Sequence, residues 1–201
     1  GFDVTVYNRT AKKAEAWATE HGGASAETPA QAATGADIIV TCVGNDDDLR
    51  AVTLENSGVL AGAGKGSLVI DHTTASAIVA REVAEAAAAI GVGFLDAPVS
   101  GGDVGAKNGT LSIMIGGDEE AVGALGPLFN AMGKNITHLG PAGSGQHTKM
   151  VNQILIASTM VGVVEGLLYG YKAGLDLDTV IAAVGAGAAA TLADASSVCS
   201  D

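Results

Sequence analysis

The segment GSGQHTKMVNQ, residues 143–153, holds the residues of this sequence best arranged for chemistry. Lys149 lies near the start of a long apolar stretch, and Asn152 and Gln153 follow it three and four residues later. On a helix, side chains at these spacings share one face. A cation in the first turn opposes the helix dipole, so a lysine there is disfavoured as mere surface decoration. The spacing therefore indicates a helix that presents an ammonium group beside a carboxamide.

A second group of polar residues, Asn8, Arg9 and Thr10, follows the predicted strand of residues 3–7. In dinucleotide-binding α/β sheets, an acid at this place accepts hydrogen bonds from the ribose 2′-hydroxyl of NAD. Arginine instead can donate two hydrogen bonds to a 2′-phosphate, and Asn and Thr can add donors. We predict that these three residues bind the cofactor, with NADP favoured over NAD. The alternative is that Arg9 is a solvated surface charge.

These residues need a scaffold, and the sequence predicts one in which short apolar runs alternate with alanine-rich helical segments. The expected strands are residues 3–7, 37–43, 67–71, 91–98, 111–117 and 135–140. The expected helices between them are residues 11–21 (with Thr10 as N-cap), 46–52, 75–90 and 119–132. The pattern predicts a Rossmann-type parallel α/β sheet. Because no G-x-G-x-x-G turn joins a strand to a helix, we expect the first strand and the pyrophosphate loop to precede residue 1.

The alternation stops near Gln146, where about 25 residues without a strand signal end at Gly174, a natural helix C-cap. A further helix is expected after Asp176. The sequence therefore predicts a dinucleotide-binding domain over residues 1–142, followed by a long helix and the start of a helical domain over residues 143–201. The long helix could be a membrane span, but three polar residues interrupt it, so we expect a buried helix and no membrane.

Composition excludes several classes of function. Twenty-two acidic residues against ten Lys and Arg give a net charge of −12, which repels nucleic acid. The two cysteines and four histidines show no metal-ligand spacing, so we expect no metal. The cysteine pattern and the lack of a signal-peptide pattern predict a cytoplasmic protein.

Three motifs together carry a family resemblance: DHTTAS (residues 71–76), DAPVSGG (residues 96–102) and GSGQHTKMVNQ. They resemble the β-hydroxyacid dehydrogenases, which include 3-hydroxyisobutyrate dehydrogenase and tartronate semialdehyde reductase. The motifs occur in the family's order, and the resemblance covers nearly the whole chain. It implies a Rossmann-type domain joined by a long helix to a helical domain, a small carboxylate-bearing substrate, and a homodimer or homotetramer.

The resemblance also implies site residues. Lys149 matches the catalytic acid/base, which exchanges a proton with the substrate oxygen and stabilises charge on it. Ser100, Gly101 and Gly102 match the substrate loop, where a hydroxyl and close backbone N–H groups can bind a carboxylate. A substrate-binding amide falls at Asn152 or Gln153; Asn152 is preferred because Gln153 is longer.

The cofactor contacts carry over to Cys42, Val43, Gly44 and Asn45, after the strand of residues 37–43, and to Thr74. Thr74 could equally cap the next helix. The family often has proline where Gly44 stands, so this loop departs from the family pattern at that position.

The remaining departure concerns the substrate. A Gly-Ser-Trp-like stretch of the family is replaced here by GAGAAATLADASS, residues 185–197, so tartronate semialdehyde and 3-hydroxyisobutyrate both stay open. Two other functions compete with an NADP-dependent dehydrogenase. An imine reductase shares the architecture but generally lacks the lysine. A non-catalytic dinucleotide-binding or scaffold module would not need it either. Without a pyrophosphate loop, the chain alone is not expected to turn over.

Overall fold

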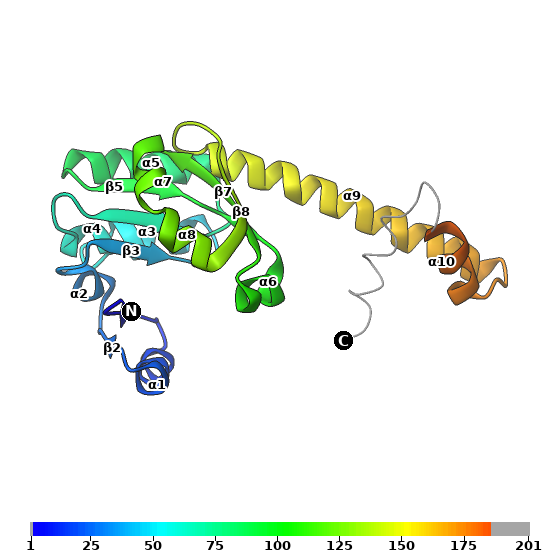
Figure 1. Ribbon diagram of the computed structural model, residues 1–201, viewed down its shortest axis with the longest axis horizontal. Helices are drawn as coiled ribbons and strands as arrows, with labels where there is room; N and C mark the ends of the chain where they lie inside the picture. Colours follow the sequence, from blue (N-terminus) through cyan, green and yellow to red (C-terminus); the bar gives the residue numbers. More distant parts are fainter. Residues whose placement is uncertain (1, 186–201) are drawn as a thin grey trace. The chain divides into compact units, whose positions relative to one another are not determined.

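The computed structural model describes residues 2–185 (Figure 1). The chain separates into two compact units, Gly1–Lys149 and Met150–Asp201. The first unit is an α/β domain of the Rossmann type, as the sequence predicts. The second holds most of the long helix and one further described helix.

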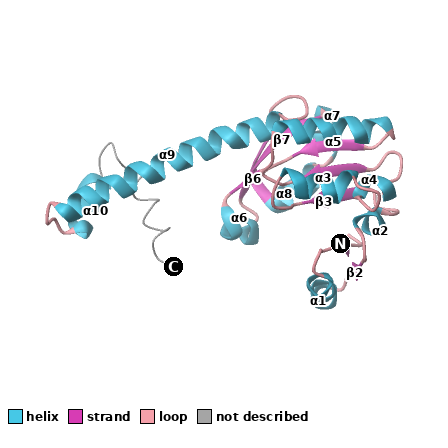
Figure 2. Ribbon diagram, turned by 180° about the vertical axis from the view of Figure 1, so that it is seen from behind, coloured by secondary structure: helices cyan, strands magenta, loops and turns pink. Residues whose placement is uncertain are grey.

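A six-stranded sheet forms the centre of the first unit, and Figure 2 shows its strands in magenta. Its strands are β3 (Ile38–Thr41), β4 (Leu68–Asp71), β5 (Gly93–Asp96), β6 (Val99–Ser100), β7 (Leu111–Gly117) and β8 (Gly133–His138). The order is β3-β4-β5-β7-β6, with β8 paired to β7. β3, β4 and β5 are parallel, whereas β7 runs antiparallel to β5 and β6. A separate parallel pair joins β1 (Thr5–Val6) to β2 (Ala24–Ser25).

The helices of the first unit follow the expected order, with short additions. They are α1 (Ala11–His21), α2 (Pro29–Ala33), α3 (Asp46–Leu54), α4 (Val59–Gly62), α5 (Ala77–Ala89), α6 (Gly102–Asn108), α7 (Glu119–Ala124) and α8 (Gly126–Met132). The single helix expected over residues 119–132 is two helices that meet at Leu125. Pro127 explains the break, because proline has no N–H and its ring clashes with the carbonyl of the preceding turn.

Alternating side chains of β4 and β5 place a core on each face of the sheet. Val69 and Phe94 pack with the helices α3, α4 and α5. Ile70 and Leu95 face the opposite way and pack with β7 and with Phe129 of α8. This burial on both faces explains why the sequences of these strands are continuous apolar runs. Their carboxyl ends lie at one edge of the sheet, where open α/β sheets bind ligands.

The helix α9 (Ser144–Lys172) ends as the sequence predicts. Gly174 has the positive φ (76°) that a glycine C-cap adopts. The next helix, α10 (Leu177–Gly185), begins after Asp176, whose carboxylate accepts a hydrogen bond from the N–H of Thr179 at 2.9 Å. The part of the predicted tail beyond residue 185 lies outside the described residues.

The expectation that the long helix is buried is wrong for this chain. An 18-residue window of α9 has a mean hydropathy of 1.6, and none of it is buried. By length and composition alone, α9 could cross a membrane. The exposed window excludes the start of α9, where Gln146 and Lys149 are buried; within the described part of the second unit, α10 is the only other helix and has nine residues.

Candidate functional site

Lys149 lies at the carboxyl edge of the sheet and is only 8% exposed. Its Nζ donates a hydrogen bond to the carbonyl oxygen of Val99 at 2.7 Å. Because Val99 immediately precedes Ser100, this bond brings the predicted acid/base group to the predicted substrate loop. Burial lowers the pKa of Lys149. A lowered pKa brings a lysine closer to the range in which it can accept as well as donate a proton.

The start of α9 is seated on the carboxylate of Asp96, at the end of β5. Oδ1 accepts the N–H of Gly143 at 2.7 Å, and Oδ2 accepts the N–H of Gln146 at 2.9 Å. These are N–H groups that a helix cannot satisfy internally, and a carboxylate suits the positive end of its dipole. Burial raises the pKa of Asp96, while the N–H donors oppose that shift. This role was not predicted from the sequence, although an acid ending an apolar strand is a signal for it.

The glycines of the GSG segment allow this close seat. A Cβ on Gly145 would lie 2.6 Å from the backbone oxygen of Asp96 and 2.9 Å from its Oδ2. Gly143 has a φ of +92°. Side chains at these two positions would push α9, and with it Lys149, away from the strand. The tight approach expected from the two glycines is therefore confirmed.

The predicted substrate residues lie where β6 passes into α6. Ser100 pairs with Ser112 in the sheet and is half-buried, and Gly101 and Gly102 are exposed. Both glycines have positive φ, 134° and 61°, a backbone region that other residues rarely adopt. The segment is thus a strand end and a helix start, with exposed backbone beside the Lys149–Val99 contact.

The loop after β3 is fixed to the loop after β4 by a chain of hydrogen bonds. The N–H of Val43 donates to Oγ1 of Thr73 at 3.0 Å, and this hydroxyl donates to Oδ1 of Asp71 at 2.6 Å. Thr41 donates to the same oxygen at 2.8 Å. Burial raises the pKa of Asp71 to about 6, against the hydrogen bonds from the threonines. Asp71 thereby holds together the two loops predicted to contact the cofactor.

The residues that these loops present outward match the predicted cofactor set. Cys42, Gly44, Asn45 and Thr74 are exposed, and Val43 is half-buried. Burial of part of the Cys42 side chain, with the nearby Asp71, raises the pKa of its thiol, so it is not a reactive thiolate. The positions therefore offer an amide, a hydroxyl and a side-chain-free backbone at the ends of two adjacent parallel strands.

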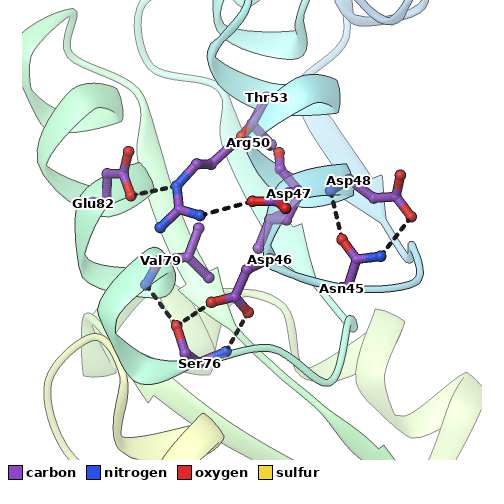
Figure 3. A network of polar contacts seen from close by, with 10 residues as sticks. Asn45, Asp46, Asp47, Asp48, Arg50, Thr53, Ser76, Val79 and Glu82 are labelled. Carbon is purple, nitrogen blue, oxygen red and sulfur yellow. Dashed lines mark hydrogen bonds and ion pairs between the residues drawn. The ribbon is translucent and has the colours of Figure 1, made fainter.

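The start of α3 explains why the loop after β3 is ordered (Figure 3). The side chain of Asn45 caps the helix by accepting the N–H of Asp48 at 2.9 Å. Asp46 accepts the N–H and the hydroxyl of Ser76 at 2.8 and 2.5 Å, and these bonds lower its pKa. Ser76 in turn caps α5 by accepting the N–H of Val79 at 3.2 Å. The alternative role of Thr74 as the cap of this helix is thus wrong, because Ser76 occupies that position.

The predicted 2′-phosphate residues are placed differently. Arg9 is 84% exposed along its side chain and forms an ion pair with Asp48 at 3.1 Å. Asn8 accepts the N–H of Thr10 at 2.8 Å. Thr10 stands at the predicted N-cap position of α1, but its side chain makes no capping hydrogen bond. All three residues are exposed.

Asn152 and Gln153 follow Lys149 on α9 but belong to the second unit. Oδ1 of Asn152 is buried and has no hydrogen-bond partner among the described residues, whereas Gln153 is exposed. An unpaired buried oxygen is costly unless a ligand or another group satisfies it. Within the described residues, no group of three or more His, Cys, Asp or Glu side chains could hold a metal ion.

Two family models match the chain. The NAD-binding domain of 6-phosphogluconate dehydrogenase matches residues 1–140, and the NAD-binding domain of NADP-dependent 3-hydroxyisobutyrate dehydrogenase matches residues 143–198. An uncharacterised oxidoreductase from Shewanella frigidimarina is 51% identical over 189 residues, which are 94% of this chain and 65% of that protein. The chain belongs to the β-hydroxyacid dehydrogenase family. It spans about two thirds or less of the length of such curated relatives.

Further similarities agree with this family. A probable 3-hydroxyisobutyrate dehydrogenase-like mitochondrial protein from Arabidopsis thaliana is 47% identical over 190 residues, covering 94% of this chain and 56% of that protein. The solved structure of Mycobacterium tuberculosis 3-hydroxyisobutyrate dehydrogenase with L-serine has a TM-score of 0.84 and 32% identity, covering 94% of this chain and 64% of that one. The matched family models are NAD-binding domains, and exposed polar residues are present at the ends of β3 and β4.

Proposed function

We propose that a protein containing this chain transfers a hydride between NADP(H) and a small β-hydroxyacid or its semialdehyde, such as tartronate semialdehyde or 3-hydroxyisobutyrate. The observation that supports the proposal is the hydrogen bond from Lys149 to the carbonyl oxygen of Val99, the residue before the Ser-Gly-Gly segment. It joins an acid/base group of lowered pKa to a segment that can bind a carboxylate. The similar mycobacterial dehydrogenase was solved with L-serine, which is itself a β-hydroxyacid.

In this proposal Thr74 and the loop of residues 42–45 hold the nicotinamide side of the cofactor. When bound, the nicotinamide supplies or accepts the hydride. Ser100 and the backbone of Gly101 and Gly102 bind the substrate carboxylate. The substrate oxygen then faces Lys149, and Asn152 donates a hydrogen bond to the substrate.

Lys149 performs the proton step. In the reductive direction its ammonium donates a proton to the oxygen of the carbonyl group, and it stabilises the developing negative charge. In the oxidative direction the neutral amine accepts the hydroxyl proton. Burial lowers the pKa of Lys149, which favours the neutral amine that the oxidative direction requires. Reduction should therefore slow, and oxidation accelerate, as pH rises through that pKa.

The choice of NADP over NAD rests on Arg9. Its exposed guanidinium can make two charge-assisted hydrogen bonds to a 2′-phosphate. The phosphate would compete with Asp48 for the same group, which weakens but does not remove the preference. NAD stays the alternative cofactor.

The proposal extends to the setting of the protein. The exposed apolar residues along α9 are consistent with a homodimer or homotetramer that covers them. The net charge of −12 supports a protein that does not bind nucleic acid. We propose a cytoplasmic location and no membrane insertion, with residues 1–142 and 143–201 as the parts of two domains.

The direct test uses intact protein with the additional length of its relatives. It is assayed with NADPH and with NADH against tartronate, methylmalonate and succinic semialdehydes, and in reverse against 3-hydroxyisobutyrate and L-serine. Turnover of a carboxylate-bearing substrate supports the proposal. Turnover of cyclic imines alone would favour the imine reductase alternative, and cofactor binding without any turnover would favour the non-catalytic module.

A further inference from the structure

Gln146 is a buried polar residue that the proposed mechanism does not use. It lies in the first turn of α9, three residues before Lys149, and is 2% exposed. Its Nε2 donates to the carbonyl oxygen of Thr73 at 2.7 Å, and its Oε1 accepts the N–H of Ala75 at 3.0 Å. These two backbone groups flank Thr74. The Gln146 side chain therefore forms hydrogen bonds with the backbone on both sides of Thr74, a predicted cofactor contact.

The backbone of Gln146 is also held by a hydrogen bond. Its own N–H donates to Oδ2 of Asp96 at 2.9 Å, so it connects the helix of Lys149 to the end of β5 and to the segment after β4. A buried carboxamide whose two ends are both hydrogen-bonded has a defined orientation. An apolar side chain of similar volume would fill the space but leave a buried N–H and a buried carbonyl unpaired.

We propose that Gln146 is a positioning residue that holds the Thr74 segment in register with Lys149, an inference that rests on the proposed dehydrogenase function. Hydrogen bonds on both sides of Thr74 leave this segment little freedom to move relative to the first turn of α9. The cofactor that contacts Thr74 is thereby placed relative to the acid/base group. Loss of these two hydrogen bonds should weaken cofactor binding and should also slow the transfer of the proton and the hydride.

The test is Gln146→Met in the intact protein. Without the two hydrogen bonds of the side chain, we expect the Kd and KM for NADPH to rise about tenfold and kcat to fall by a similar factor. The Kd is measured by NADPH fluorescence and does not depend on turnover. The amide of Ala75, which loses its acceptor, should exchange its hydrogen with solvent faster than in wild type, measured on the cofactor-free protein.

Two variants serve as controls. His147→Ala changes an exposed neighbour on the same turn, and it should leave Kd, kcat and Ala75 exchange at wild-type values. Phe129→Leu removes volume from a core on the other face of the sheet, so it should lower the midpoint of thermal unfolding. It leaves the two hydrogen bonds of the Gln146 side chain in place. Measured well below its unfolding temperature, it should keep the wild-type Kd and KM.

The outcomes separate the inference from the proposed function. If Gln146→Met behaves as Phe129→Leu does, losing stability while Kd and KM stay unchanged, Gln146 only packs and the inference is overturned. Wild-type protein that binds NADPH but turns over no substrate overturns the proposed function, whereas a weakened Kd and faster Ala75 exchange in the variant would still support the positioning role of Gln146. Wild-type protein that binds neither NADPH nor NADH overturns both.

Discussion

The Lys149 region, predicted at the start of a helix, and the Arg9 region, predicted at the end of a strand, are held by different kinds of contact. Lys149 is buried, and its helix is fixed by the carboxylate of Asp96 and by the side chain of Gln146. Arg9 is exposed, and its side chain pairs with Asp48 at 3.1 Å. Buried hydrogen-bonded groups specify geometry, whereas exposed ion pairs contribute about 0–1 kcal/mol and rearrange easily. The proposed function thus assigns the proton transfer to the region held by buried contacts and the cofactor choice to the region held by an exposed ion pair.

The largest effect is expected at Lys149. Lys149→Ala should lower kcat about 10²–10⁴-fold, because general acid–base catalysis contributes on that scale. The Kd for NADPH should stay within about twofold, because the exposed cofactor loop is fixed by Asp71 instead. Stopped-flow turnover and fluorescence titration check the two quantities.

Lys149→Arg sharpens the same point. Arginine can keep a hydrogen bond to Val99, but its guanidinium stays protonated and cannot accept a proton near neutral pH. We expect the oxidative reaction to lose more activity than the reductive one. Equal retention of activity in both directions would show that the lysine binds substrate electrostatically and does not transfer a proton.

A smaller effect concerns the pH dependence of stability at Asp71. Its pKa is about 6 in the folded protein, against about 3.9 in an unfolded chain. The folded state therefore holds its proton more tightly, so this contribution to stability is complete below about pH 4 and is lost as pH rises through about 6. This difference between the folded and unfolded pKa values of Asp71 corresponds to about 3 kcal/mol of unfolding free energy.

Asp71→Asn removes this titration. The unfolding free energy of wild type minus that of the variant should fall by about 3 kcal/mol between pH 3 and pH 8, measured by urea denaturation at each pH. Glu85→Gln, which removes an exposed carboxylate outside this hydrogen-bond chain, provides the matched control for the loss of one negative charge. A constant difference between wild type and Asp71→Asn would show that folding does not raise the pKa of Asp71.

The same contrast explains what the sequence could predict. The strand of residues 111–117 and the helix of residues 11–21 are found at their predicted bounds, because their apolar patterns and glycine ends are local signals. The motif with Lys149 is found beside the Ser-Gly-Gly segment. The hydrogen bonds of α9 to Asp96 and of the Gln146 side chain to the backbone of Thr73 join residues between 47 and 73 positions apart. No local sequence pattern encodes such pairs. The exposure of α9 was missed because apolar composition alone does not reveal what covers a helix.

A further prediction addresses the Arg9 region. Arg9→Asp should shift the ratio of kcat/KM for NADPH over NADH about 10–100-fold toward NADH, because a charge-assisted bond to the 2′-phosphate is replaced by repulsion. The measurement is the steady-state ratio for both cofactors at fixed ionic strength. Equal loss with both cofactors would place Arg9 outside the 2′-phosphate site.

The smallest effect is expected at Asp48, and it tests whether the exposed pair opposes cofactor choice. The carboxylate of Asp48 holds Arg9 at 3.1 Å and also accepts a hydrogen bond from the side chain of Asn45 at 3.2 Å. A 2′-phosphate bound by Arg9 must displace this carboxylate and would feel its negative charge. Asp48→Asn keeps the shape and an acceptor for Asn45 but removes the charge. We expect the NADPH over NADH ratio to rise about two- to fivefold, the range of an exposed ion pair.

Salt provides the matching control for Asp48→Asn. Because exposed charges are screened within about 10 Å at 0.1 M ionic strength, the difference between wild type and variant should shrink as salt is added. Asp47→Asn, which changes the neighbouring exposed acid that pairs with Arg50, should leave the ratio unchanged. If Asp48→Asn instead lowers the preference for NADPH, the carboxylate orients Arg9 toward the phosphate and does not compete with it, and the exposed pair then fixes geometry much as the buried contacts around Lys149 do.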